Sequence, residues 1–118
     1  MSDYDHLRVE KREDTLIVHF LDRKIHAELV ISTLGEELNA VAARPDCQKL
    51  ILNFGGVEFF SSAVFGKLIM LNKFMGEKGG VLRLCEICDS LRILFKLTKL
   101  ERILNVHDTL DEALSISP

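Results

Sequence analysis

The order of hydrophobic and polar positions divides the chain into short strands and longer helices. Residues 7–11 alternate apolar and polar side chains, as half-buried strands do, and residues 15–20 form a β-branched, apolar run beyond the polar turn at 13–14. These two segments predict a hairpin. The short apolar runs 49–54 and 81–85 are bounded by turn residues and predict buried strands at the centre of a sheet.

Between the strands, apolar residues recur every three or four positions, which is the spacing of an amphipathic helix. Helices are expected over about 27–43, about 63–75 and about 91–97, with a short edge strand over 103–106 and a last helix beyond it. The first two helices are expected to bury Leu29, Val30, Leu34, Leu38, Val41 and Ala42, and Val64, Phe65, Leu68, Ile69, Leu71, Phe74 and Met75.

Polar residues that commonly cap helices precede the last three helices. The expected N-caps are Ser61 or Ser62 for the second helix, Asp89 or Ser90 for the third, and Thr109 or Asp108 for the last. Glu112 stands three residues after Thr109, which is the spacing of a capping box.

The order β-β-α-β-α-β-α-(β)-α predicts an α/β fold. Strands that alternate with helices form a mostly parallel sheet through right-handed crossovers, and the opening hairpin adds an antiparallel edge. We therefore expect a mixed, mostly parallel sheet of about four or five strands with about four helices. The 118 residues fit one domain, expected over 1–118 with its core at about 7–114.

Composition and charge narrow the classes of function. The net charge is −3 with acids and bases interleaved, which argues against a large basic face for nucleic acid or anionic lipid. Three cysteines do not make a disulfide framework, and the polar N-terminal segment is not typical of a signal peptide. The apolar runs are far shorter than the ~20 residues that span a bilayer. We expect a cytoplasmic protein without membrane insertion.

Catalytic and metal-binding patterns are scarce. Four histidines are scattered without metal-ligand spacing, and no glycine-rich phosphate loop occurs, so we expect no metal, no cofactor and no enzymatic activity. Cys85 and Cys88 form a Cys-x-x-Cys pair, with Cys47 alone elsewhere. A redox pair favours a helix start, whereas Cys85 ends a predicted strand and Cys88 falls in the turn beyond it. A structural role is favoured, with a redox-responsive dithiol as the alternative.

One segment, residues 53–66, runs from a central strand through a loop into a helix. Ser61 and Ser62 thus lie at a helix N-terminus beyond the carboxyl end of a strand, where open α/β sheets place their sites. That terminus favours an anion, and a phosphate on either serine would add a charge of about −1.5 to −2. The alternative is that one serine only caps the helix. Phe59 and Phe60 belong either to the core or to a binding surface.

This segment resembles the STAS domain family, which includes anti-sigma-factor antagonists and the cytoplasmic tails of sulphate transporters. The family pattern is an apolar strand ending in Asp, then roughly Ser/Thr-Gly-Val-x-x-x-Asp-Ser-Ser/Thr-Gly-Leu-Gly, then an apolar helix. Residues 50–66 follow that pattern, and the resemblance continues through 79–84, 94–100 and 108–114. It covers nearly the whole chain, from about 7 to 114.

The resemblance implies a switch operated by phosphorylation. Family members of this class bind an anti-sigma factor that is also a serine kinase, lose that binding when phosphorylated, and regain it through a phosphatase. The phosphorylated serine corresponds to Ser62, with Ser61 as the fallback. The residues implied as partner contacts are Asp22, Phe59, Phe60, Ser61, Ser62, Ala63 and Phe65.

The sequence departs from the family pattern at four positions. Ser61 stands in place of the motif Asp, Ala63 in place of its second hydroxyl, Val64 in place of its first Gly, and Asn53 in place of the strand-end Asp. Three hypotheses therefore remain: a phosphorylation-controlled antagonist in sigma-dependent transcription, a constitutive unphosphorylated adaptor in a signalling or transport complex, and a redox-responsive protein. The oligomeric state is expected to be a monomer or a weak dimer.

Overall fold

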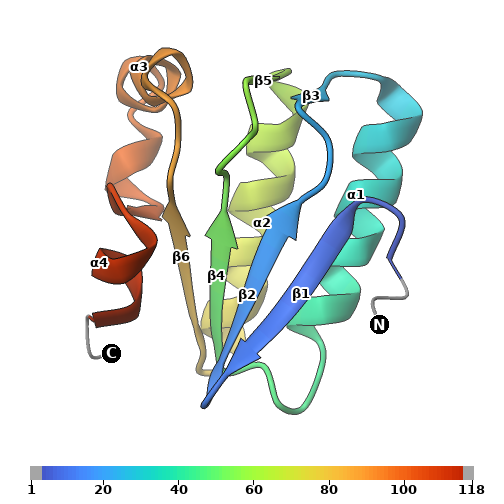
Figure 1. Cartoon of the computed structure of the whole chain (residues 1–118), viewed down its shortest axis with the longest axis vertical. Helices are drawn as coiled ribbons and strands as arrows, with labels where there is room; N and C mark the ends of the chain where they lie inside the picture. The colour runs from blue at the N-terminus through green and yellow to red at the C-terminus, as the bar shows by residue number, and fades with distance from the viewer. Residues whose placement is uncertain (1–3, 116–118) are drawn as a thin grey trace.

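A five-stranded sheet organises residues 4–115, the part of the chain that the computed structural model describes (Figure 1). Its strands are β1 (Leu7–Arg12), β2 (Thr15–Phe20), β4 (Lys49–Asn53), β6 (Val81–Cys85) and β7 (Asn105–Val106), in the order β1-β2-β4-β6-β7. The hairpin of β1 and β2 is antiparallel and every other pairing in this sheet is parallel. The expected α/β fold is confirmed, including the antiparallel edge. Residues 1–3 and 116–118 of the expected domain lie outside the described range.

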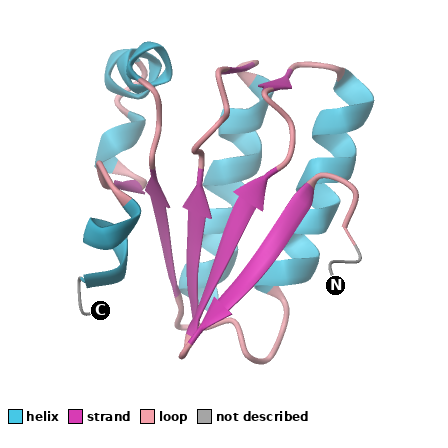
Figure 2. Ribbon diagram, viewed as in Figure 1, coloured by secondary structure: helices cyan, strands magenta, loops and turns pink. Residues whose placement is uncertain are grey.

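Helices cover both faces of the sheet (Figures 1 and 2). The helices are α1 (Glu28–Ala42), α2 (Ala63–Glu77), α3 (Asp89–Leu97) and α4 (Leu110–Ser115), with a 3-10 turn, η1 (Leu100–Arg102). The main core joins α1, α2 and α3 to alternate strand residues such as Leu16, Leu50 and Leu82. On the opposite face, Ala113 of α4 covers Ile17, Ile51 and Cys85. Alternating strand residues thus face different layers, because successive side chains of a strand point to opposite sides.

The fourth helix is held at its start by Glu86, the residue after β6, and near its end by Arg83 of β6. The carboxylate of Glu86 accepts a hydrogen bond from the Leu110 N–H at 2.7 Å, and the guanidinium of the buried Arg83 donates to the Ala113 carbonyl at 2.9 Å. An anion at the start of a helix and a cation at its end both complement the helix dipole. This small helix is therefore held to the sheet by charge as well as by apolar contact.

Three short elements were not predicted from the sequence. They are β3 (Lys24–Ile25), β5 (Phe59–Phe60) and η1, and β3 pairs with β5 as a separate two-stranded parallel sheet. The expected edge strand is shorter, since only Asn105–Val106 pairs with β6. The elements β3, β5, β7 and η1 have only two or three residues each. That is too few for the hydrophobic period of a strand (two residues) or of a helix (3.6 residues) to be recognised.

The predicted caps and apolar faces need correction at several positions. Ser62 occupies the N-cap position of α2 but its hydroxyl makes no capping hydrogen bond, and Cys88, rather than Asp89 or Ser90, occupies that of α3. The Thr109 prediction is confirmed: Thr109 Oγ1 accepts from the Glu112 N–H at 3.1 Å. The Glu112 carboxylate instead reaches the Asp108 N–H, at 3.3 Å. Three expected core residues have exposed side chains: Leu29, Ile69 and Phe74.

Across residues 4–115, every helix is too short or too polar to traverse a bilayer. The same residues contain no cluster of three or more histidine, cysteine or acidic side chains that would hold a metal ion.

Candidate functional site

The loop between β4 and α2 is fixed by the small sheet at the carboxyl end of the main strands (Figure 1). The Arg23 carbonyl accepts the Glu58 N–H at 2.7 Å, and the Ile25 carbonyl accepts the Ser61 N–H at 3.0 Å. An ion pair between Arg23 and Glu58 adds a side-chain link, which lowers the pKa of the Glu58 carboxyl through hydrogen bonding and charge. Residues 58–61, which precede α2, are therefore held by residues 23–25, which lie about 35 positions earlier in the chain.

The exit from β4 explains two of the motif positions. The Asn53 side-chain oxygen accepts the Gly55 N–H at 2.8 Å, and Gly56 has a φ of 92°, which glycine adopts without strain. An aspartate at position 53 would offer the same acceptor oxygen, so the Asn53 departure from the family pattern preserves this turn.

Phe59 and Phe60 have opposite roles although they are adjacent. The Phe60 side chain is 1% exposed, and its ring centroid lies 5.8 Å from Phe54, 5.2 Å from Phe65 and 6.2 Å from Phe95. Phe65 is also buried, at 9% exposed. Phe59 is 44% exposed. The expectation that Phe60 and Phe65 contact a partner is therefore corrected, because both rings belong to the core that supports the loop.

The two serines occupy different environments at the start of α2. Ser62 is exposed, has helical backbone angles, and its hydroxyl makes no hydrogen bond to any residue in the range 4–115. Ser61 is half-buried, and its N–H is held by the Ile25 carbonyl. Ala63, next along the chain, is exposed. We call Phe59, Ser61, Ser62 and Ala63 the Ser62 surface.

A groove borders the Ser62 surface between the starts of α1 and α2. Its lining residues are His26, Glu28, Ile31, Ser32, Ser61, Ala63 and Lys67. The aliphatic chain of Lys67 lies over Gly35 of α1, where an added Cβ would come within 2.9 Å of Lys67 Cδ. The groove thus presents two serine hydroxyls, the Lys67 ammonium group and the Glu28 carboxylate beside the exposed Ser62.

Three residues of the groove were not predicted from the sequence: His26, Ser32 and Lys67. Lys67 follows Ala63 by four residues, so a helical spacing alone places it on the same face. His26 and Ser32 come from another segment, and only the pairing of β3 with β5 brings them to this end of the sheet. The predicted contact Asp22 does not line the groove, and its carboxylate lies 2.6 Å from His6 Nδ1.

The Cys-x-x-Cys pair is divided between two environments. Cys85 is fully buried, its Sγ donates weakly to the Leu52 carbonyl at 3.7 Å, and burial raises the pKa of its thiol to about 12. Cys88 is partly exposed and lies in the segment beyond β6, as expected, where it occupies the N-cap position of α3. Because only a thiolate attacks readily, the buried Cys85 argues against the redox-responsive alternative.

The fold and the loop before α2 define an α/β domain of the STAS architecture. This chain belongs to the STAS domain family, whose family model matches residues 6–113.

Solved structures of the same fold include two described as antagonists. An anti-sigma-factor antagonist (STAS) domain protein from Planctomyces limnophilus has a TM-score of 0.82 at 22% identity, covering 92% of this chain and 94% of that one. An anti-sigma factor antagonist from Mycobacterium paratuberculosis has a TM-score of 0.78 at 23% identity, covering 92% and 90%. The Bacillus cell fate determinant SpoIIAA, in its phosphorylated form, has a TM-score of 0.67 at 15% identity, covering 92% and 96%. At these identities the likeness shows the fold.

Proposed function

We propose that this STAS domain is an anti-sigma-factor antagonist that binds an anti-sigma factor with serine kinase activity through the Ser62 surface. The observation that carries the proposal is that Ser62 is exposed at the start of α2 and that its hydroxyl makes no hydrogen bond within residues 4–115. A kinase can reach such a hydroxyl without unfolding the loop. The exposed Phe59 beside it supplies the aromatic contact that protein interfaces favour.

Phosphorylation acts as a release signal in this proposal. The Ser62 Oγ attacks the γ-phosphorus of ATP bound to the kinase, ADP leaves, and the hydroxyl proton passes to a base of the kinase. The phosphate then lies at the N-terminus of α2, where the backbone amides tolerate its charge. Binding of the partner would bury this charge beside Phe59 and Ala63, and desolvation of the phosphate weakens the complex. A phosphatase that hydrolyses the phosphoserine restores binding.

The neighbouring groove distinguishes the two serines. Ser61 lines the groove together with Lys67, whereas Ser62 does not. A phosphate on Ser61 would enter a groove that holds both the Lys67 ammonium group and the Glu28 carboxylate, whereas a phosphate on Ser62 would stand on the exposed surface beside Phe59 and Ala63. Ser62 is therefore the residue whose phosphorylation is expected to repel a partner most strongly, and Ser61 remains the fallback acceptor.

Substitution of Ser62 tests the proposal by calorimetric titration against the anti-sigma factor kinase of the same cells. Ser62→Asp should weaken binding at least tenfold, or about 1.4 kcal/mol, and Ser62→Ala should preserve it. Ser90→Asp is the matched control, since it adds the same charge at an exposed serine in the first turn of α3. Equal affinity for Ser62→Asp and Ser62→Ala would contradict the switch.

A constitutive adaptor is the second candidate. The supporting observation is Ser61, which stands where the family pattern has Asp, so the acceptor lacks a neighbouring carboxylate. Incubation with the kinase and ATP separates the two candidates, because an adaptor that binds the kinase without gaining the mass of a phosphate would support the second.

A further inference from the structure

A second exposed surface lies on α3 and the turn that follows it. Six exposed residues lie within eleven positions of α3 and η1: Ile93, Lys96, Leu97, Lys99, Arg102 and Ile103. The three apolar members are 55%, 73% and 54% exposed, in chain order. Ile93 and Leu97 are four residues apart on one helix and therefore lie side by side on its outer face. We call these six residues the α3–η1 surface.

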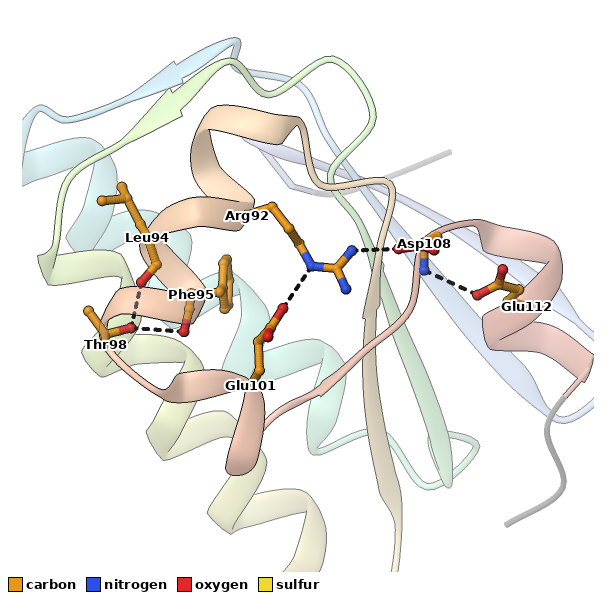
Figure 3. Close-up of polar contacts among 7 residues, drawn as sticks. All are labelled: Arg92, Leu94, Phe95, Thr98, Glu101, Asp108 and Glu112. Atoms are coloured by element: carbon orange, nitrogen blue, oxygen red, sulfur yellow. Dashed lines mark hydrogen bonds and ion pairs between the residues drawn. The ribbon is translucent and has the colours of Figure 1, made fainter.

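The charge of this surface is positive because, counted with Arg92, its four cations outnumber the two neighbouring acids, Glu101 and Asp108. Arg92 Nε donates to Glu101 Oε1 at 2.9 Å, and Arg92 Nη1 donates to Asp108 Oδ1 at 2.7 Å (Figure 3). The only acid on α3 itself, Asp89, lies in its first turn, away from Lys96.

Within residues 4–115, Lys96, Lys99 and Arg102 form no ion pair. The Asn72 side chain of α2 donates to the Ile103 carbonyl at 3.3 Å and links η1 to α2. The net charge of −3 for the whole chain does not reveal this local excess of cations.

The backbone at Lys99 adds an independent observation. Lys99 has a φ of 61°, in the left-handed region, directly after the C-cap of α3. Glycine is the usual residue there because a Cβ is unfavourable in that conformation. Thr98 stabilises the same helix end by donating to the Leu94 carbonyl at 2.7 Å (Figure 3). Lys99→Gly should therefore ease the backbone at this helix end, so that loss of the lysine side chain can be tested without loss of stability.

We propose that the α3–η1 surface binds an anionic lipid bilayer peripherally. Apolar side chains flanked by lysine and arginine suit the boundary between headgroups and acyl chains, where the cations contact lipid phosphates. Protein interfaces, by contrast, are depleted in lysine and enriched in aromatic residues, and this surface has neither feature. The proposal concerns contact with the membrane surface and is independent of phosphorylation at Ser62.

Vesicle co-sedimentation of the full chain tests the proposal. We expect binding to phosphatidylcholine vesicles with about one-third phosphatidylglycerol, weak binding to pure phosphatidylcholine, and loss at high salt. Each cation should contribute about fivefold, so Lys96→Gln, Lys99→Gln and Arg102→Gln together should weaken binding on the order of a hundredfold. The matched control, Arg8→Gln, Lys11→Gln and Arg12→Gln on β1, removes the same charge from another surface and should retain binding.

Two single variants separate lipid contact from folding. Lys99→Gly relieves the left-handed conformation, so its melting temperature should not fall while its affinity for the anionic vesicles drops about fivefold. Leu97→Ser, at a 73% exposed position, should also weaken vesicle binding with little change in stability. Ser62→Asp should bind vesicles like the wild type.

The proposal is overturned if the chain does not bind the anionic vesicles at low salt, or if the β1 control loses as much affinity as the α3–η1 variant. The proposal is also overturned if the three α3–η1 substitutions abolish binding to an acidic protein and leave vesicle binding unchanged. The surface would then be a protein interface.

Discussion

The adjacent residues Phe59 and Phe60 provide a sharp test of how the core supports the Ser62 surface. Phe60 is 1% exposed and lies among three other phenylalanine rings, whereas Phe59 is 44% exposed. We predict that Phe60→Ala destabilises the fold severely and that Phe59→Ala does not. The two variants differ by one position and delete the same atoms, so each is the control for the other.

The expected magnitude follows from burial. Removing a fully buried phenylalanine ring costs about 3–5 kcal/mol, which combines lost transfer free energy with the cavity left behind. The edge-to-face contacts with Phe65 and Phe95, at interplanar angles of 84° and 88°, place the value toward the upper part of that range. Phe59→Ala should change the free energy of unfolding by about 0.5 kcal/mol or less, as exposed substitutions usually do.

Urea denaturation followed by circular dichroism measures the difference. With a slope of about 1–3 kcal/mol per molar urea, the loss for Phe60→Ala moves the midpoint by at least about 1 M. If that variant is unfolded in water, Phe60→Leu provides a milder step that is expected to cost less than Phe60→Ala. Phe59→Ala should instead weaken binding to the anti-sigma factor kinase. Equal midpoints for Phe59→Ala and Phe60→Ala would refute this assignment of core and surface.

Two further predictions concern packing and thiol chemistry. Gly80→Ala should lower stability by about 1–3 kcal/mol, because its Cβ would lie 2.7 Å from the Gln48 carbonyl oxygen. Gly76→Ala, in α2 with open space around it, should raise stability by about 0.5–1 kcal/mol. Thermal melting measures the stability of both variants. A Gly80→Ala variant as stable as Gly76→Ala would contradict the close contact at Gly80. In native protein near neutral pH, iodoacetamide should modify Cys88 and leave Cys85 intact, because burial raises the pKa of Cys85 to about 12. Formation of a Cys85–Cys88 disulfide under mild oxidation would restore the redox hypothesis.

The main sheet and the long helices could be predicted because each has a repeating pattern. The hairpin of β1 and β2 and the central strands β4 and β6 occupy the segments indicated by alternation and by apolar runs. The two-residue strands β3 and β5 could not be predicted, since they depend on backbone hydrogen bonds between positions about 35 residues apart.

Side-chain roles within the site were less predictable than its location. The position of Ser62 at the start of α2 followed from the motif and from helical spacing. Phe59 and Phe60 look equivalent in sequence, yet an extended segment directs successive side chains to opposite sides, so only one of them reaches the core. His26 joins the site through the pairing of β3 with β5, which no local pattern encodes, whereas the helical spacing from Ala63 places Lys67 there.

The proposed binding switch depends on phosphorylation of Ser62. Intact-mass analysis of the protein isolated from its native cells, with the modified residue mapped by fragmentation, tests it most directly. We expect a fraction of the protein to carry one phosphate on Ser62, and that fraction to change between growth and stress conditions. A single unmodified mass under every condition would contradict the switch and favour the constitutive adaptor.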